Sequence, residues 1–281
     1  MNRHTVFRAS WICVNVSLLI SVAGFLFCLG WEFSVRNYLK GFSDAIIPYS
    51  STPEQKAESI LAWMQYGPAR RTSASSNLLN PRDPEETLNY KELLQVCGTA
   101  TNAFVNLAYS SGLQARRLLL LDSNRSTKHV VVEVHIDGRW VVVDPAFRIF
   151  FRDAQGRFLT RDQLRDPAIF RQATGVMPNY PSSYTYESTA HVRLSRIPEV
   201  GRYLRILLDR VWPGWDEAVN WTLLVERESF TLLMVSATLL SLLLLCRLFL
   251  NWYGKRRFGF VSVRMRDQVW RAGAALFSHS K

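Results

Sequence analysis

The chain has 281 residues, of which 48% are hydrophobic, and its formal net charge is +11. This length allows one or two domains, and the hydrophobic share is ample for a packed core. Residues 32–228 are close to neutral, since they hold 24 of the 34 basic and 22 of the 23 acidic side chains. Because most of the positive excess flanks two apolar segments, the charge indicates membrane topology and argues against a nucleic-acid partner.

Both apolar segments are long enough to cross a bilayer as helices. Residues 11–31 carry no charged side chain and have a tryptophan at each edge. Residues 229–252 carry only Arg247, close enough to the end of the run for its guanidinium to snorkel to the interface. The sequence therefore predicts two transmembrane helices, the first an uncleaved anchor.

Basic residues next to these segments predict the orientation of the chain. Residues 1–10 carry two arginines, and the tail formed by residues 253–281 carries seven basic residues against one aspartate. By the positive-inside rule both termini are expected in the cytoplasm, with residues 32–228 as one domain on the other side. The short cytoplasmic ends favour a bacterial inner-membrane protein whose domain is periplasmic.

The first elements of this domain are predicted to be helical. The Thr-Pro-Glu-Gln pattern at residues 52–55 is a capping box and predicts a helix that ends near residue 66. Residues 67–86 are rich in Pro, Ser, Asn and Arg and predict a loop. A second helix is expected over residues 98–110, ended by Gly112. The side chains expected to be buried are Ile60, Leu61, Met64, Ala100, Phe104, Leu107 and Ala108.

A β-hairpin is the best-determined element. An Asp-Gly pair at residues 137–138 is a strong signal for a two-residue turn, and it sets Ile136 opposite Arg139. Since opposed residues point to the same side of a sheet, the register divides the hairpin into two faces. One face carries His129, Val131, Glu133, Trp140 and Asp144, and the other carries Val130, Val132, Val134, Val141 and Val143.

The remaining elements are expected to be short. Residues 116–121 predict a strand before the hairpin, and residues 147–159 predict a second strand-turn-strand unit. Thr160 is expected to cap a short helix over residues 161–164. Residues 175–200 show no clear periodicity, and a helical pattern after them leads into the second apolar segment.

One cysteine lies outside the apolar segments. Cys13, Cys28 and Cys246 fall within these segments, so that Cys97 is alone in residues 32–228. No disulfide can form there, and no Cys/His spacing indicates a metal site. Taken by itself, such a cysteine is more often a small buried core residue than a reactive one.

A histidine and an aspartate follow Cys97 in the order nucleophile, base and orienting carboxylate. A thiol at a helix N-terminus is acidified by the helix dipole, and an adjacent imidazole can take its proton. The hairpin register brings Asp144 diagonally next to His129, within reach of an extended side chain. The pattern favours nucleophilic catalysis by a thiolate.

Other assignments of these side chains remain open. A strand histidine is commonly a hydrogen-bonded structural residue, and an aspartate before proline commonly begins a turn. A pair formed by His135 with Glu133 competes with the pair of His129 and Asp144. His191, for which the sequence shows no partner, is expected to be structural.

Three blocks of sequence carry a family resemblance. They are Val-Cys-Gly-Thr-Ala at residues 96–100, the histidine strand at residues 129–134, and Asp-Gly-Arg-Trp-Val-Val-Val-Asp-Pro at residues 137–145. In this order they resemble the transglutaminase-like superfamily over roughly residues 54–164. The resemblance implies an α+β, papain-like core in which a cysteine-bearing helix packs on an antiparallel sheet, here between the two transmembrane helices.

The same resemblance implies roles for three residues. Cys97 is the expected nucleophile, His129 the general base and acid, and Asp144 the carboxylate that orients the imidazole. The backbone N–H of Cys97 can donate to a developing oxyanion, with Gln95 as a further candidate donor. Val96 precedes the cysteine where animal transglutaminases have glutamine, so calcium dependence and glutamine crosslinking are not carried over.

These observations predict a membrane-anchored, thiol-dependent acyl-transfer enzyme that needs no cofactor or metal. Its expected partners are the lipid bilayer and amide bonds in peptides, proteins or cell-envelope material, cleaved by a peptidase or amidase or exchanged by a transamidase. The alternative is a non-catalytic interaction module in a cell-envelope or polysaccharide-export assembly, which would tolerate Cys97→Ala. Acetyl transfer from a thioester donor uses the same triad and is a third possibility.

Overall fold

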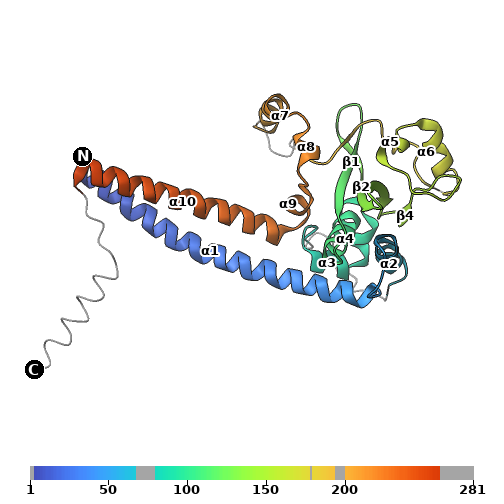
Figure 1. Cartoon of the computed structure of the whole chain (residues 1–281), viewed down its shortest axis with the longest axis horizontal. Coiled ribbons are helices and arrows are strands. Elements are labelled where there is room, and N and C mark those ends of the chain that lie inside the picture. Colours follow the sequence, from blue (N-terminus) through green and yellow to red (C-terminus); the bar gives the residue numbers. More distant parts are fainter. Residues whose placement is uncertain (1–2, 68–79, 178, 194–199, 260–281) are drawn as a thin grey trace, which may run out of the picture. The chain divides into compact units, whose positions relative to one another are not determined.

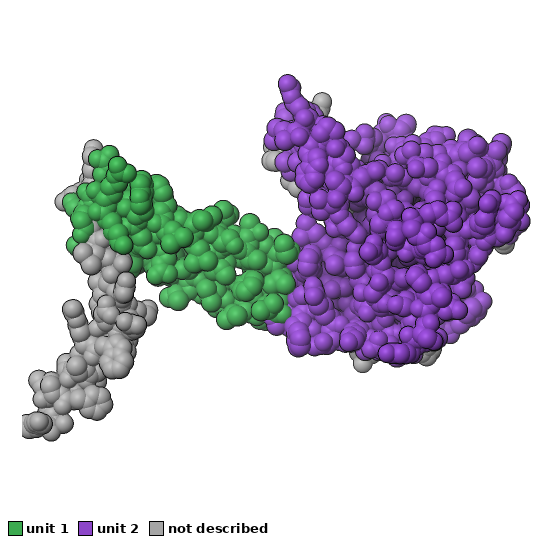
Figure 2. All heavy atoms as spheres, in the orientation of Figure 1, with its two compact units in different colours: residues 1–29, 233–281 green, residues 30–232 purple. Residues whose placement is uncertain are grey.

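A computed structural model describes residues 3–67, 80–177, 179–193 and 200–259. The chain divides into two compact units, residues 1–29 with 233–281 and residues 30–232 (Figure 2). In chain order the elements are α1 (Arg3–Ile46), α2 (Pro53–Tyr66), α3 (Pro84–Asn89), the 3-10 helix η2 (Lys91–Gln95), α4 (Cys97–Ser110), β1 (Ala115–Leu121), β2 (Thr127–Ile136), β3 (Arg139–Asp144), β4 (Ile149–Phe150), α5 (Arg161–Leu164), α6 (Pro167–Thr174), β5 (Thr189–Ala190), α7 (Val200–Val211), α8 (Trp215–Ala218), α9 (Thr222–Glu226) and α10 (Glu228–Phe258) (Figure 1).

In its described residues, the first unit consists of parts of the two long helices α1 and α10. Both α1 and α10 are long and apolar enough to cross a membrane, and each contains one of the segments predicted to do so. Within this unit the indole Nε1 of Trp11 donates to Asn251 Oδ1 at 3.0 Å. The rings of Phe7 and Phe258 lie 5.2 Å apart. The predicted basic tail lies mostly outside the described residues.

In the second unit, α1 continues well beyond the predicted span. Apolar residues at positions 35, 39, 42 and 46 recur at helical spacing, and Leu39 is fully buried in the core of this unit. The ring of Phe42 meets Trp63 of α2 edge-on at a centroid distance of 4.7 Å. The last part of α1 is therefore a core helix of the second unit, for which the sequence pattern predicts no element.

Helix α2 begins and ends as predicted. Thr52 Oγ1 accepts the N–H of Gln55 at 3.3 Å, while Gln55 Oε1 accepts the N–H of Thr52 at 2.9 Å, which completes the capping box. Helix α4 also ends as predicted, because Gly112 follows it with a φ of +79° that glycine adopts without strain. The seven apolar side chains expected to be buried in α2 and α4 are all buried.

The predicted loop over residues 67–86 needs a correction. Residues 68–79 lie outside the described residues, but the last part of the range is helical, because α3 begins at Pro84. Asp83 caps this helix by accepting the N–H of Glu85 at 2.9 Å, and proline fits its first turn. The Asp-Pro pair at residues 83–84, inside the range predicted as a loop, begins this helix.

The five strands form an antiparallel sheet in the order β4-β3-β2-β1-β5. The hairpin of β2 and β3 has the predicted register, since Ile136 pairs with Arg139 and Val132 with Val143. Both turn residues have positive φ, 48° at Asp137 and 78° at Gly138, as a tight two-residue hairpin turn requires.

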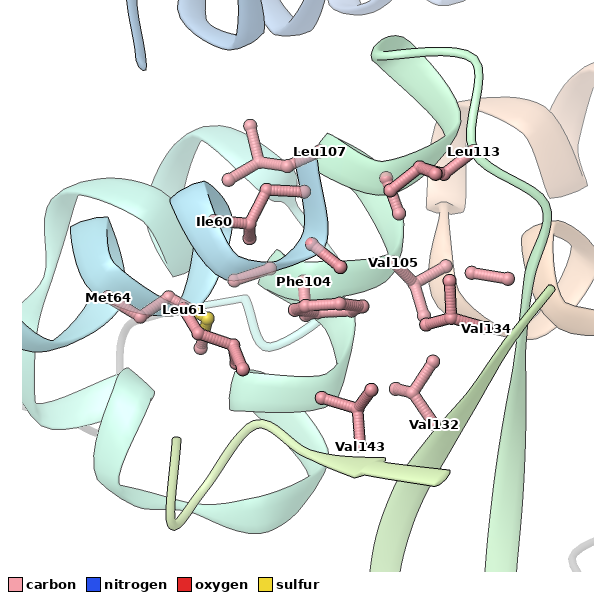
Figure 3. Close-up of a cluster of buried hydrophobic side chains, with 14 of the residues drawn as sticks. Ile60, Leu61, Met64, Phe104, Val105, Leu107, Leu113, Val132, Val134 and Val143 are labelled. Atoms are coloured by element: carbon pink, nitrogen blue, oxygen red, sulfur yellow. The ribbon is translucent and has the colours of Figure 1, made fainter. Parts of the chain in front are cut away.

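The two faces of this sheet are covered by different parts of the chain. On one face, Phe104 of α4 lies at the centre of the main apolar cluster, between Ile60 of α2 and the valines Val132 and Val143 (Figure 3). The opposite face carries a second cluster that includes Val131 and is closed by α5, α6 and the segment after them. The predicted division of the hairpin into two faces is thus confirmed, and the α+β class with it.

The C-terminal part of the second unit is less regular than the rest. The predicted turn in residues 147–159 is present, closed by a 2.9 Å bond from the N–H of Asp153 to the carbonyl of Arg157, but β4 is only two residues long. Thr160 caps α5 as expected. Within residues 175–200, read as irregular, β5 pairs with β1. The helical pattern that follows is broken at Gly214, whose φ is +79°.

Replacing Gly138 by alanine is expected to lower the free energy of unfolding by about 1–2 kcal/mol, because an L side chain in the left-handed region is strained. Urea denaturation followed by tryptophan fluorescence measures the change. Gly41→Ala is the matched control of opposite sign, since Gly41 lies within α1, where an added methyl group meets open space and alanine favours helix. Equal effects of the two substitutions would contradict the turn geometry.

Candidate active site

Cys97 is the first residue of α4 and follows the 3-10 helix η2. The hydroxyl of Thr99 donates to the carbonyl of Val96 at 3.1 Å and also to that of Leu93, so that the entry into the helix is held by side-chain bonds. As the first helical residue, Cys97 has an N–H without an acceptor inside the helix. Its half-buried side chain packs on a small apolar cluster formed by Leu119, Leu121, Val130 and Ala190.

His129 lies near the beginning of β2, beside an irregularity in the pairing with β1. His129 pairs with Leu120, but the next pair joins Thr127 to Leu121, so that Lys128 is an extra residue in β2. The imidazole is buried, and the ring of Tyr184 stacks on it at 4.2 Å with an angle of 7° between the planes. The ring plane of His129 is therefore fixed by packing as well as by hydrogen bonds.

Asp144 ends β3 and is fully buried next to His129. Its Oδ2 accepts from Nε2 of His129 at 2.7 Å and from the hydroxyl of Tyr180 at 3.1 Å. Its Oδ1 accepts the backbone N–H groups of Ala146 and Phe147 at 3.0 and 3.2 Å. The carboxylate is thus held by four donors. Because it binds Nε2 of His129, this nitrogen points toward Asp144 and away from Cys97.

Since Nε2 of His129 is bound to Asp144, Nδ1 is the nitrogen left for Cys97. A side-chain hydrogen bond with His129 lowers the pKa of the Cys97 thiol despite its burial, and the backbone N–H groups of Val130 and Gly98 lower this pKa further. Burial would lower the pKa of His129, but its hydrogen bonds to Asp144 and Cys97 raise it to about 9. Both directions favour a thiolate beside an imidazolium.

Two tyrosines of this site were not predicted. Tyr180 and Tyr184 belong to the segment that the sequence leaves unassigned, and they surround Asp144 and His129. Burial holds the pKa of Tyr180 well above its usual range, so that its hydroxyl keeps its proton and remains a donor to Asp144. The only sequence signal for them is the frequency of tyrosine in residues 175–200. Because this segment has no periodicity, the sequence does not show which tyrosines face the sheet.

A second buried histidine–carboxylate pair lies on the same face of β2. His191 Nε2 is 2.9 Å from Oε2 of Glu133, and Nε of Arg116 is 2.7 Å from the same oxygen. Although burial raises it, the pKa of Glu133 is lowered by the bond to His191 and by the charge of Arg116. His191 therefore has a partner that the sequence did not reveal. The competing pair of His135 with Glu133 is wrong, because His135 packs edge-on against Trp140 instead.

Gln95, the further oxyanion candidate, ends η2 two residues before Cys97 and has an exposed side chain. Its role stays a prediction. Within the described parts of the chain, no group of three or more His, Cys, Asp or Glu side chains is arranged to hold a metal ion. The structure brings Cys97, His129 and Asp144 together.

A protein-family model matches part of the chain. The model of the transglutaminase-like superfamily matches residues 40–145, a stretch that contains Cys97, His129 and Asp144. No curated protein and no solved structure matches the chain significantly. The family resemblance drawn from the three sequence blocks is confirmed for this stretch.

Proposed function

We propose that this chain, whose residues 40–145 form a transglutaminase-like domain, is a membrane-anchored enzyme that transfers acyl groups from amide bonds through Cys97, His129 and Asp144. One observation carries the proposal: a half-buried thiol lies beside a buried imidazole, which is hydrogen-bonded at 2.7 Å to a buried carboxylate. An interaction module would need the fold but not this arrangement of the three side chains.

In the first half of the proposed reaction, the thiolate of Cys97 attacks the carbonyl carbon of the amide. The negative charge that develops on the carbonyl oxygen is stabilised by the backbone N–H of Cys97, a type of interaction worth about 3 kcal/mol. As the C–N bond breaks, Nδ1–H of His129 gives its proton to the leaving amine, and a thioester remains on Cys97.

In the second half, water or another amine attacks the thioester. His129 takes the proton of this nucleophile, the C–S bond breaks, and the thiolate and imidazolium are restored. Water makes the enzyme a peptidase or amidase, whereas an amine makes it a transamidase. Asp144 keeps the imidazole in the tautomer and orientation that both halves need, and the stacked ring of Tyr184 holds its plane.

The membrane placement belongs to the same proposal. Two helices of sufficient length and apolarity, with basic residues beside both, support an anchor that crosses the bilayer twice. The termini would be cytoplasmic and the domain would face the outer side, which in a bacterial inner membrane is the periplasm. Peptides, proteins and cell-envelope material carrying amide bonds are the substrates within reach.

The rate of iodoacetamide alkylation of Cys97 against pH tests this proposal. The full-length protein in detergent, with Cys13, Cys28 and Cys246 replaced by serine, reports Cys97 alone. We expect a midpoint well below the ordinary thiol value of about 8.5, because the imidazolium stabilises the thiolate. His129→Ala should move the midpoint back up, whereas His135→Ala is the control and should leave it in place.

Two outcomes would contradict the proposal. One is an ordinary thiol profile that does not respond to His129→Ala, and the other is a thiol that does not react in the folded protein. Either would favour the interaction module in an envelope or polysaccharide-export assembly. That alternative predicts unchanged function in a Cys97→Ala variant.

A further inference from the structure

Helix α7 carries an apolar face that is exposed. Tyr203, Leu207 and Val211 recur every four residues and therefore lie along one side of the helix. Their exposed fractions are 73%, 56% and 73%. Contiguous apolar surface of this kind on a folded domain marks an interaction site.

The opposite side of α7 carries a polar pair that is itself partly exposed. Asp209 Oδ1 accepts from the indole Nε1 of Trp215 at 3.0 Å, and Trp215 is itself buried. Arg205 reaches the same carboxylate from the preceding turn, at 3.3 Å. Among the described elements, none packs extensively on α7. A surface helix normally turns its apolar side to the core, whereas the apolar face of α7 is left exposed.

We propose that α7 lies in the headgroup region of a lipid bilayer, with its apolar face toward the acyl chains. Charge complementarity favours this occupant over a protein, because Arg210 at the edge of the apolar face and Arg205 on the polar side can meet anionic headgroups. Trp212 follows the helix directly, half exposed at 48%, and an indole is suited to the membrane interface.

The position of α7 in the chain supports the same occupant. Residues 212–227 alone separate it from α10, one of the two helices that are apolar enough to span a membrane. The inference rests on the membrane placement proposed above, but it is independent of the acyl-transfer chemistry. A helix fixed at the bilayer surface would favour substrates presented close to the membrane.

Depth-dependent quenching tests this contact in the full-length protein. The four native cysteines are replaced by serine, and one new cysteine is introduced and labelled with an environment-sensitive fluorophore. The labelled protein is placed in nanodiscs of phosphatidylcholine and phosphatidylglycerol, with or without spin-labelled lipid. Leu207→Cys is expected to give blue-shifted, strongly quenched emission. Val176→Cys is the matched control, since Val176 is an exposed apolar residue (83%) outside α7, and it should give neither.

A label at Leu245, in α10, separates the failure of this inference from the failure of the membrane anchor. Quenching at residue 245 but not at residue 207 would overturn the contact of α7 and leave the anchor standing. A blue shift at residue 207 without quenching would overturn it in favour of a protein partner. No quenching at residue 245 would overturn both. In Arg205→Gln/Arg210→Gln, quenching at residue 207 should weaken, which tests the role of anionic headgroups.

Discussion

Replacing Asp144 by alanine is expected to lower the free energy of unfolding by about 3–5 kcal/mol. The substitution would leave one buried and three partly buried donors without their acceptor: the imidazole of His129, the hydroxyl of Tyr180 and the N–H groups of Ala146 and Phe147. Urea denaturation of the full-length protein in detergent, followed by tryptophan fluorescence, measures the change. Acylation of Cys97 by p-nitrophenyl acetate should also slow by about 10²–10⁴-fold, the usual contribution of a general base that is no longer oriented.

Asp144→Asn is the control that separates charge from shape. The amide oxygen can still accept the N–H groups of Ala146 and Phe147, so the protein should remain folded. The negative charge that raises the pKa of His129 to about 9 is lost. In the wild type, acylation of Cys97 by an amide substrate should fall as the pH rises through about 9, because the imidazolium that protonates the leaving amine loses its proton. In Asp144→Asn this fall should occur at lower pH. An unchanged alkaline limit would refute the role of Asp144.

A buried polar network connects α1 with the helix that carries Cys97. Glu32 of α1 accepts from Arg227 at 3.1 Å and from Ser229 at 2.7 Å. Arg227 in turn donates to Asn106 of α4 at 2.7 Å. Glu32, Arg227 and Ser229 are all nearly inaccessible to solvent. In this buried site the carboxylate of Glu32 and the guanidinium of Arg227 therefore neutralise each other.

Replacing Glu32 by alanine is expected to lower the free energy of unfolding by about 3–5 kcal/mol, because a buried guanidinium would remain without its carboxylate. The same urea denaturation measures it. Glu58→Ala is the matched control, since Glu58 pairs with Arg152 at 2.9 Å on the surface. Exposed pairs of this kind contribute at most about 1 kcal/mol.

The double variant Glu32→Met/Arg227→Met tests the reason for the loss. If the cost arises from an uncompensated charge, the double variant should be much more stable than Glu32→Ala, because apolar side chains can replace a buried pair with little loss. A double variant as unstable as the single one would instead locate the cost in lost packing or in the bond to Asn106.

Local sequence determined the elements whose signals act over a few residues. The capping box at Thr52 and the turn at Gly138 each satisfy backbone groups of near neighbours, so they could be identified without a fold. The turn also fixed the register of the hairpin, and with it the side-chain face shared by His129 and Asp144. In the same way Cys97 was singled out as the lone cysteine between two apolar segments.

Only the tertiary structure decided which residues complete the site. Tyr180 and Tyr184 reach Asp144 and His129 from a segment without periodicity, and Glu133 takes His191 as its partner across 58 positions of the chain. Such contacts depend on how the sheet and its covering segments pack, and local patterns carry no information about them. The continuation of α1 into the core and the outward apolar face of α7 were missed for the same reason: a helical pattern predicts a face, but its surroundings decide what that face meets.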